Sequence, residues 1–398
     1  MDNKNKRIYV DNAATTPVIP EVVEAMMPCF NEYWGNPSSL HEDGQAAGAL
    51  LAESRKTIAD LIGAKSEREI YFTSCGSESD NWAIKGAAHA AKNGRNRIVT
   101  SKIEHHAVMH TCEALAKEGY DIVYVGVHEN GIIDLDELKA EVNDKTALVA
   151  VMMANNEIGT IQPIKEIAAI AHAAGALCFT DAVQAVGSIP VNVTELGVDM
   201  LAFSGHKFGA PKGIGALYVK KGVVIKNLID GGGQESGKRG GTENLPYIVG
   251  LAKALQIATD RLPDADRISK MRDRLIDGLL EIPYSKLNGS RELRLPGNVN
   301  VSFEFVEGES LLLWLDISGI SASTGSACSS KSLEPSHVLL STGLPIEMAH
   351  GSLRFSLSHL NTDEDVDKIL QVMPEIVGKL RAMSPIYPGA EKNVEFIK

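Results

Sequence analysis

Apolar residues in the first half of the chain gather in short runs separated by stretches with helical spacing. The predicted strands are residues 70–73, 97–100, 122–125, 147–153, 176–180 and 199–203. The run 147–153 is apolar throughout, which is typical of a strand buried on both faces of a sheet. The main helices predicted in this part are residues 20–30, 44–62, 77–92, 135–142 and 164–174. Because strands and helices alternate up to Lys207, we expect an α/β fold with a mostly parallel sheet flanked by helices.

The pattern changes after long helices predicted over residues 245–282. Residues 298–305 alternate between apolar and polar side chains, as in a strand that is half exposed to solvent. A helix over 308–316 and short strands over 320–323 and 352–357 follow, which predicts a small α+β domain. A chain of 398 residues is also longer than a single core usually supports. We therefore predict a large domain of residues 15–260 and a small one of residues 1–14 and 261–398.

Composition excludes several classes of partner and location. The net charge of −12 should repel nucleic acid and anionic membrane, so we expect neither as a partner. No apolar run approaches the ~18 residues that a membrane span needs, and residues 1–10 lack the apolar core of a signal peptide. The five cysteines show no CxxC spacing, so neither a disulfide framework nor a cysteine-based zinc site is predicted. We expect a cytoplasmic protein with reduced thiols.

Lys207 follows the predicted strand 199–203 within the sequence Ser204-Gly205-His206-Lys207. A lysine at the end of a buried strand can lose hydration, which lowers its pKa and leaves a nucleophilic amine. Ser204 and His206 offer polar groups beside it that could hold a phosphate. A surface lysine in a turn explains this stretch equally well when it is taken alone.

Asp181 ends the predicted strand 176–180, and Gln184 follows three residues later. A carboxylate at that position could accept a hydrogen bond from a protonated ring nitrogen. The alternative is an ordinary helix cap. We favour a functional role because the same topology, with a polar group at the end of a strand, repeats at Lys207.

Small residues around Gly76 and Ser77 connect the predicted strand 70–73 to a helix. Backbone N–H groups at such a helix start favour an anion, which makes the turn a candidate phosphate cradle. Taken alone, the turn is better explained by Ser77 acting as an ordinary N-cap. A second polar cluster, which includes Asn156, follows the strand 147–153, where a parallel sheet places its ligands. No GxGxxG or GxxxxGK[ST] sequence is present, so neither a dinucleotide site nor a P-loop is predicted.

Three histidines lie close together after the strand 97–100. His106 and His110 are four residues apart and could share a helix face as metal ligands, but no glutamate follows in a metalloprotease pattern. We therefore predict no metal site. His105, at the end of the strand, is better placed to stack on a planar ligand.

Cys328 stands among small residues in a segment of about residues 321–333. Cysteine is usually buried, so a cysteine on an exposed loop suggests a reactive thiol. The alternative is that the loop simply buries Cys328.

In this order and spacing, the motifs resemble those of cysteine desulfurases of the NifS/IscS type. These are pyridoxal-phosphate (PLP) enzymes of fold type I in the class V aminotransferase family. The resemblance runs through nearly the whole chain. Its segments are residues 11–17, 35–39, 72–74, 78–81, 104–105, 155–159, 181–184, 204–207, 239–242, 325–328 and 354–356. The chain departs from the pattern at Cys75 and Ala210, where glycine is frequent, and at Ser77, where threonine is common.

The resemblance implies roles around the cofactor ring. Lys207 would form the Schiff base and move the substrate proton, and Asp181 would pair with the pyridinium nitrogen. Gln184 would hydrogen-bond the ring hydroxyl. His105 would stack on the ring face and take part in proton transfer, and Asn156 would lie near the ring.

The resemblance also implies groups for the phosphate and the substrate. The phosphate would be held by Gly76, Ser77, Ser204, His206 and Thr242, the last reaching the neighbouring subunit's cofactor. Asn36 and Arg354 would bind the substrate carboxylate, for which the planar fork of arginine is suited. A homodimer is therefore expected.

The implied reaction converts L-cysteine to L-alanine and leaves the sulfur on Cys328 as a persulfide. The loop would then deliver the sulfur to an iron–sulfur scaffold or a thiolation protein, and Cys328 could transiently ligate a cluster. The alternatives are a selenocysteine lyase or another class V PLP enzyme. A catalytically silent relative is disfavoured because Lys207 and Asp181 are both present.

Overall fold

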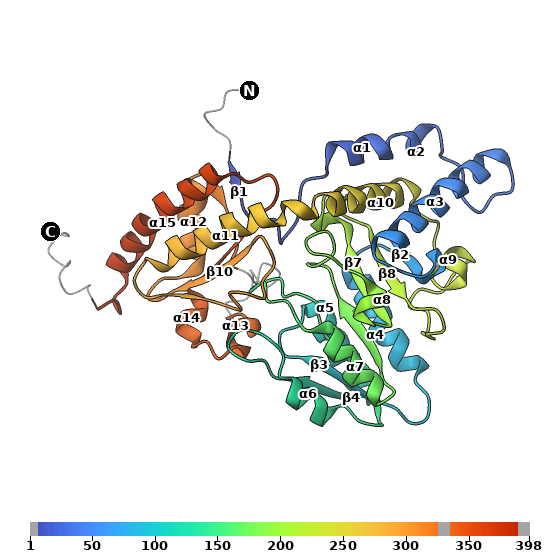
Figure 1. Ribbon diagram of the computed structural model, residues 1–398, viewed down its shortest axis with the longest axis horizontal. Helices are drawn as coiled ribbons and strands as arrows, with labels where there is room; N and C mark the ends of the chain where they lie inside the picture. The colour runs from blue at the N-terminus through green and yellow to red at the C-terminus, as the bar shows by residue number, and fades with distance from the viewer. Residues whose placement is uncertain (1–6, 325–334, 389–398) are drawn as a thin grey trace.

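The computed structural model describes residues 7–324 and 335–388. Two sheets form the cores of two parts that lie side by side. Most of the blue to yellow segments of Figure 1 build the larger part, and the orange and red segments, with the blue strand at the N-terminal end, build the smaller one. Helices α10 (Leu245–Asp260) and α11 (Ala265–Leu280) follow one another along both parts. The domain limits proposed from the sequence, 15–260 against 1–14 with 261–398, stay a prediction.

The larger sheet has seven strands. In spatial order they are β2 (Ile70–Thr73), β8 (Gly215–Val219), β7 (Met200–Ser204), β6 (Leu177–Asp181), β5 (Thr146–Ala150), β3 (Arg97–Ser101) and β4 (Asp121–Val125). The pairs from β7 to β4 are parallel, whereas β8 is antiparallel to both of its neighbours. The predicted mostly parallel sheet is confirmed. The sequence pattern missed β8, which a glycine-rich turn folds back onto β7, with Gly209 and Gly213 at positive φ.

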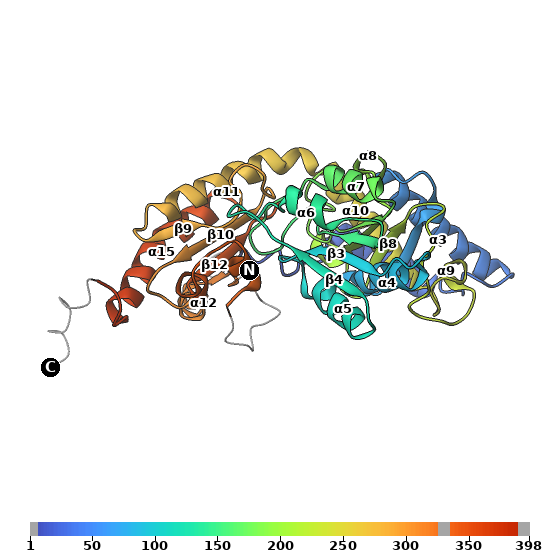
Figure 2. The same cartoon turned by 90° about the horizontal axis from the view of Figure 1, so that it is seen from below.

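Helices cover both faces of this sheet (Figures 1 and 2). On one face, α4 (Gly76–Ala90) and α5 (His106–Lys117) pack on a cluster that contains Leu148 and Ala150. On the other face, α7 (Ile164–Ala173) and others pack on a cluster that contains Val149. Neighbouring residues of β5 therefore enter different cores, which explains why its sequence is apolar without alternation.

The smaller sheet is antiparallel, with the order β12 (Ser352–Ser356), β10 (Asn298–Phe303) and β9 (Ser285–Leu287). Its core includes residues of α11, α12 (Gly308–Ile317) and α15 (Asp363–Met383). The first strand, β1 (Ile8–Tyr9), pairs in parallel with β11 (Ile320–Ser321), so the start of the described chain joins this part.

The remaining helices are short or lie at the edge of the larger part. They are α1 (Pro20–Met26), α2 (Pro28–Asn31), α3 (Glu42–Leu61), α6 (Leu135–Glu141), α8 (Val193–Leu196), α9 (Gln234–Gly237), α13 (His337–Ser341) and α14 (Ile346–His350). The helix predicted over 20–30 is divided before Pro28, as expected of a residue that lacks a backbone N–H. Across residues 7–324 and 335–388, no helix combines the length and the apolarity that crossing a membrane requires.

The prediction that strand 298–305 is half exposed is wrong. All six residues of β10 are buried, including Asn298 and Asn300. Both asparagine side chains donate hydrogen bonds of 3.1 Å to the backbone oxygen of Glu157, in the segment after β5. The polar face of β10 is therefore turned toward the larger part of the molecule, where its amides are satisfied without water.

Glu235 ties the segment after β8 to the rest of the larger part. Its carboxylate accepts two hydrogen bonds from Arg55 of α3, at 2.7 and 2.8 Å, and one of 3.1 Å from the backbone N–H of Phe72. Only 3% of the Glu235 side chain and 16% of the Arg55 side chain is exposed. Removing one member of such a buried pair leaves the other charge without compensation.

We predict that Glu235→Ala lowers the free energy of unfolding by about 3 kcal/mol, measured by denaturant titration. Glu375→Ala is the control, because Glu375 pairs with Lys379 on the exposed face of α15 and such pairs contribute only about 0.5 kcal/mol. Equal losses in the two variants would show that the Arg55–Glu235 pair does not hold this segment.

Candidate active site

Lys207 lies in the single turn Gly205–Lys207 that directly follows β7. Its Nζ donates hydrogen bonds to the backbone oxygens of Ala13, at 2.7 Å, and Ala14, at 2.9 Å. The turn places the amine at the carboxyl edge of the sheet, where parallel α/β sheets bind their ligands. The amine is part-buried rather than fully exposed.

Asp181 ends β6, the strand next to β7, and is 5% exposed. Burial raises the pKa of its carboxyl to about 6, although the N–H of Val183, at 2.9 Å from Oδ1, and the charge of Lys207 oppose that rise. Gln184 Nε2 donates to the Ala13 oxygen at 3.0 Å, the same oxygen that Lys207 contacts. The structure thus brings together Lys207, Asp181 and Gln184, as the sequence predicted.

His105 is the N-cap of α5, and its Nδ1 accepts the backbone N–H of Ala107 at 3.1 Å. Burial, reinforced by the charge of Lys207, lowers the pKa of His105 to about 4. The imidazole is therefore neutral near pH 7, and its proton is on Nε2 because Nδ1 acts as acceptor. One ring nitrogen of His105 lies within 4.8 Å of a carboxylate oxygen of Asp181 and of Asp80, a group of three that could also hold a metal ion.

Glu104 fixes the backbone just before His105. It is buried and accepts hydrogen bonds from the Ser101 hydroxyl, at 2.5 Å, and from the Met152 N–H, at 2.9 Å. Burial raises the pKa of its carboxyl to about 8. These bonds tie the end of β3 to the end of β5 and so orient His105.

Sequence reasoning missed Asp80 and Glu104 as groups of the site. Asp80 shares one face of α4 with Ala83, Ile84 and Ala87, all buried, at the spacing i, i+3, i+4 and i+7. An acidic residue on an apolar helical face was the available indication, since an acidic group is rarely buried without a specific reason.

The turn between β2 and α4 lies beside the ends of β6 and β7. A Cβ atom on Gly76 would come within 2.7 Å of Val183 Cγ2 and 3.5 Å of Ser204 Cβ, so the helix start and both strand ends are in close contact. The N-cap of α4 is Cys75, and Ser77 lies inside the first turn. The prediction that Ser77 would be an ordinary N-cap is therefore wrong, because the N-cap lies two residues earlier, at Cys75.

His206 borders the same region. Its Nδ1 is 3.1 Å from Thr15 Oγ1, and burial together with the charge of Lys207 lowers its pKa to about 4. Ser204 is buried at the end of β7. Gly76 at the start of α4 therefore lies against the segment Ser204–Lys207, which carries Ser204 and His206.

Arg354 reaches this region from β12 of the smaller sheet and is 2% exposed. Its Nη2 pairs with Asp11 Oδ1 at 2.9 Å, and its Nη1 donates to the backbone oxygen of Asn156 at 2.8 Å. Arg354 and Asn156 are thus adjacent. Asn36 and Thr242 are exposed, and no hydrogen bond among the described residues joins either of them to Lys207 or Arg354.

Cys328 lies outside the described residues. The residues on either side of 325–334 contact groups of the candidate site. Ser323 pairs with Arg354 through backbone hydrogen bonds. On the other side, Ser336 Oγ donates to Glu157 Oε2 at 2.5 Å, next to Asn156. The residues just before 325 and just after 334 therefore lie beside Arg354 and Asn156.

His106 and His110, predicted from the sequence to share a helix face but not to form a metal site, do lie on one face of α5. The ring centroids of His106 and His110 are 5.1 Å apart, and the ring of His337 lies 5.0 Å from that of His106. Burial and neighbouring histidines lower the pKa of His106.

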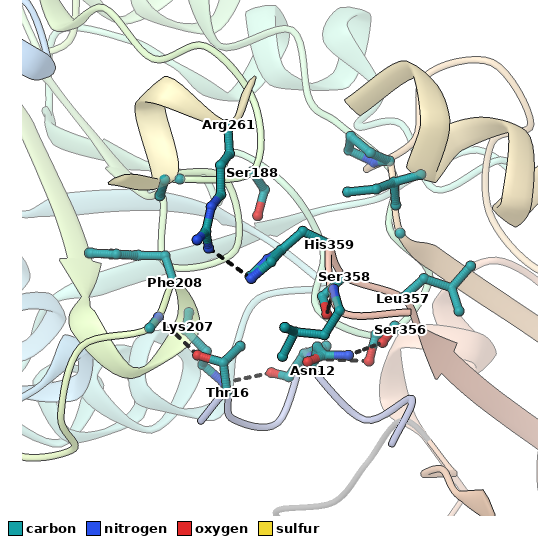
Figure 3. Close-up of a pocket in the computed structure, with 18 of the residues that line it drawn as sticks. Asn12, Thr16, Ser188, Lys207, Phe208, Arg261, Ser356, Leu357, Ser358 and His359 are labelled. Carbon is teal, nitrogen blue, oxygen red and sulfur yellow. Dashed lines mark hydrogen bonds between the residues drawn. The ribbon is translucent and has the colours of Figure 1, made fainter. Parts of the chain in front are cut away.

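A cavity of about 580 Å³ lies between the segment 12–21, the end of α10 and residues 356–360 (Figure 3). Lys207 and Gln184 line it, whereas Asp181 and His105 are absent from its described lining. Arg261 Nη1 donates to His359 Nε2 at 2.8 Å across this space. Lys207 therefore borders this cavity, and its charge also acts on the buried Asp181.

Comparison with known proteins agrees with this geometry. The pattern of the aminotransferase class-V family matches residues 8–369. The chain is 55% identical to the cysteine desulfurase IscS of Methanosarcina thermophila over 389 residues, which is 98% of this chain and 96% of the relative. It is 51% identical to the cysteine desulfurase IscS of Dictyoglomus turgidum over 382 residues, or 96% and 97% of the two chains.

A solved structure of a NifS-like protein superposes with a TM-score of 0.88 at 39% identity, covering 94% of this chain and all of the other. The predicted resemblance and fold are thus confirmed. This chain belongs to the aminotransferase class-V family, among the proteins named cysteine desulfurases.

Proposed function

We propose that this protein is a cysteine desulfurase that uses PLP to convert L-cysteine to L-alanine, with the sulfur passing to Cys328. The main support is the meeting of Lys207, Asp181 and Gln184 at the ends of two adjacent strands. The names and high identity of its relatives support the same activity.

The described residues fit the cofactor. The Asp181 carboxyl is buried, and a protonated ring nitrogen would provide a cationic partner that compensates for its burial. Gly76 lies at the start of α4 beside Ser204, so the backbone N–H groups there could bind a phosphate. When bound, PLP supplies an electron sink for the substrate carbon.

We assign the holding groups as the sequence implied. Lys207 would provide the amine that joins the cofactor, and Asp181 and Gln184 would bind its ring nitrogen and hydroxyl. The phosphate would lie among Gly76, Ser77, Ser204 and His206. The neutral ring of His105 would face the cofactor, and Asn156 would lie nearby.

The chain's own groups would position the substrate and move its protons. Arg354 would bind the cysteine carboxylate in place of part of its contact with Asp11. The Lys207 amine would take the Cα proton, and His105 Nε2 could hold a proton close to it. The Cys328 thiolate would attack the substrate sulfur. An S–S bond to Cys328 would form as the Cβ–S bond breaks, with the electron pair of that bond left on Cβ, and protonation of Cβ followed by return of a proton to Cα would yield alanine.

We also propose a homodimer. Exposed apolar side chains gather along α1, α2 and the loop after them: Val23, Met27, Phe30, Trp34 and Leu40. Apolar surface of this kind marks protein contacts. Asn36 lies within this stretch, so in a homodimer the Asn36 of one subunit would reach the active site of the other. Thr242 is expected to reach the other subunit's site in the same way.

The acceptor of the sulfur would be an iron–sulfur scaffold or a thiolation protein. The relatives' name IscS supports the first. The four cysteines among the described residues are free thiols, which agrees with a reducing, cytoplasmic location.

We predict that Cys328→Ala lowers the release of both alanine and sulfide from L-cysteine by more than about 100-fold, because no thiolate remains to attack the sulfur. Both products are measured with a reductant present. Cys29→Ala is the control, since Cys29 is a buried thiol of α2 with no described contact to Lys207. A fully active Cys328→Ala variant would instead favour a selenocysteine lyase or another class V enzyme.

We expect Arg354→Lys to raise KM for L-cysteine by about 10- to 100-fold, because one planar fork is replaced by a single ammonium group. The matched control is Arg381→Lys. Arg381 is also buried but contacts the backbone of Glu304 and Tyr284 within the smaller part. An unchanged KM in Arg354→Lys would remove Arg354 from the carboxylate site.

A further inference from the structure

Asp80 is a buried acid that the proposed reaction does not use. It is 1% exposed on the face of α4 that packs against the larger sheet. Its Oδ1 is buried and has no hydrogen-bond partner among the described residues. A carboxylate in this position would be costly, because burial without a partner disfavours the charged form.

The groups nearest Asp80 make its ionisation still less favourable. One of its oxygens lies within 4.8 Å of an oxygen of Asp181 and of a ring nitrogen of His105, which is neutral near pH 7. Burial raises the pKa of Asp80 well above its usual range, and the charges of Asp181, Glu104 and Cys75 raise it further. Among the described residues, no cationic side chain donates a hydrogen bond to Asp80 Oδ1.

The hydrophobic core that α4 shares with its neighbours contains no charged side chain. The titratable residues of α5 and β6 outside that core, apart from Asp181, are His106, His110, Glu113, Lys117 and Cys178. Strands β5 and β7 contain no titratable residue, while β2 and β8 each contribute one tyrosine, Tyr71 and Tyr218. Helix α5 contributes Cys112, and burial raises the pKa of that thiol to about 12. Burial raises the pKa of both tyrosines as well.

Two carboxyl groups this close share their protons, because ionising one opposes ionising the other. The environment decides which of them keeps the proton. Asp181 has two features that stabilise its anion, the Val183 N–H and the charge of Lys207. By contrast, no hydrogen-bond donor among the described residues reaches Asp80 Oδ1. The proton therefore belongs on Asp80, and the negative charge on Asp181.

We propose that Asp80 is a positioning residue that holds a proton, so that Asp181 is the single anion facing the cofactor ring. This inference rests on the proposed function for the role of Asp181. As a neutral acid, Asp80 can donate a hydrogen bond toward Asp181 and keep that carboxylate ionised and oriented. Were both residues ionised, their repulsion would raise the free energy of the folded site.

The first test measures the unfolding of the full chain without PLP, for the original protein and for Asp80→Asn, from pH 5 to pH 9. A carboxyl whose pKa is higher in the folded state stabilises the fold below its unfolded pKa, near 4, and loses that contribution as pH rises toward the folded pKa. Asparagine stays neutral at every pH, so its contribution to folding stability does not change with pH. The advantage of Asp80→Asn should therefore grow with pH, by up to about tenfold in the folding constant per pH unit.

The control is Asp199→Asn. Asp199 is equally buried, but its carboxylate pairs with His172 at 2.8 Å and with Lys220 at 3.4 Å. Its replacement should lower stability at neutral pH. The proposal would be overturned if the difference in unfolding free energy between Asp80→Asn and the original protein stayed constant or fell as pH rises. That result would show that Asp80 is ionised in the folded protein.

Asp80→Ser repeats the measurement if Asp80→Asn does not fold. The cost of a small cavity does not depend on pH, so the pH dependence of the unfolding free energy can still be measured.

A second readout is the absorbance spectrum of PLP bound to the full protein near pH 7. Asp80→Asn should leave it nearly unchanged, whereas Asp181→Asn should shift it. An equal shift in both variants would count against a neutral Asp80. Failure of the original protein to bind PLP would contradict the proposed function but not the protonation of Asp80, because the unfolding data measure that protonation without PLP.

Discussion

The backbone around Glu157 joins the two parts of the molecule. Its carbonyl oxygen accepts hydrogen bonds from Asn298 and Asn300 of the smaller sheet, and its side chain accepts one from Ser336. The preceding residue, Asn156, offers its oxygen to Arg354. Because these groups are buried, each of them costs free energy if its partner moves away. The relative placement of the two sheets is therefore specific, and Arg354 is held beside the carboxyl edge of the larger sheet.

The active site depends on how burial distributes charge. Asp181, Glu104 and Asp80 are carboxyl groups removed from water within one region, and His105 is kept neutral there. The differences between the acids come from their hydrogen bonds. Glu104 accepts bonds from Ser101 and Met152, while Asp181 has Val183 and the nearby Lys207. Such an arrangement allows one acid to carry charge while another carries a proton.

The N-terminal segment has more influence on the site than its position in the chain suggests. Ala13 receives hydrogen bonds from Lys207 and Gln184, and Asp11 pairs with Arg354. The same segment pairs β1 with β11 close to where the chain approaches residue 325. Binding of substrate would thus compete with contacts that connect both parts of the molecule.

Local sequence patterns were enough to predict the alternation of strands and helices and the places of Lys207 and Asp181 at the ends of strands. Both follow from local rules, since a buried parallel strand needs an apolar run and a ligand group follows where that run ends. Local pattern could not show that the polar face of β10 is buried, because Asn298 and Asn300 find their partner more than 140 residues away. Nor could it show β8, whose pairing depends on a reversal through glycines. Only the tertiary structure placed Asp80 within 4.8 Å of Asp181, because the distance between α4 and the end of β6 is set by packing across the sheet.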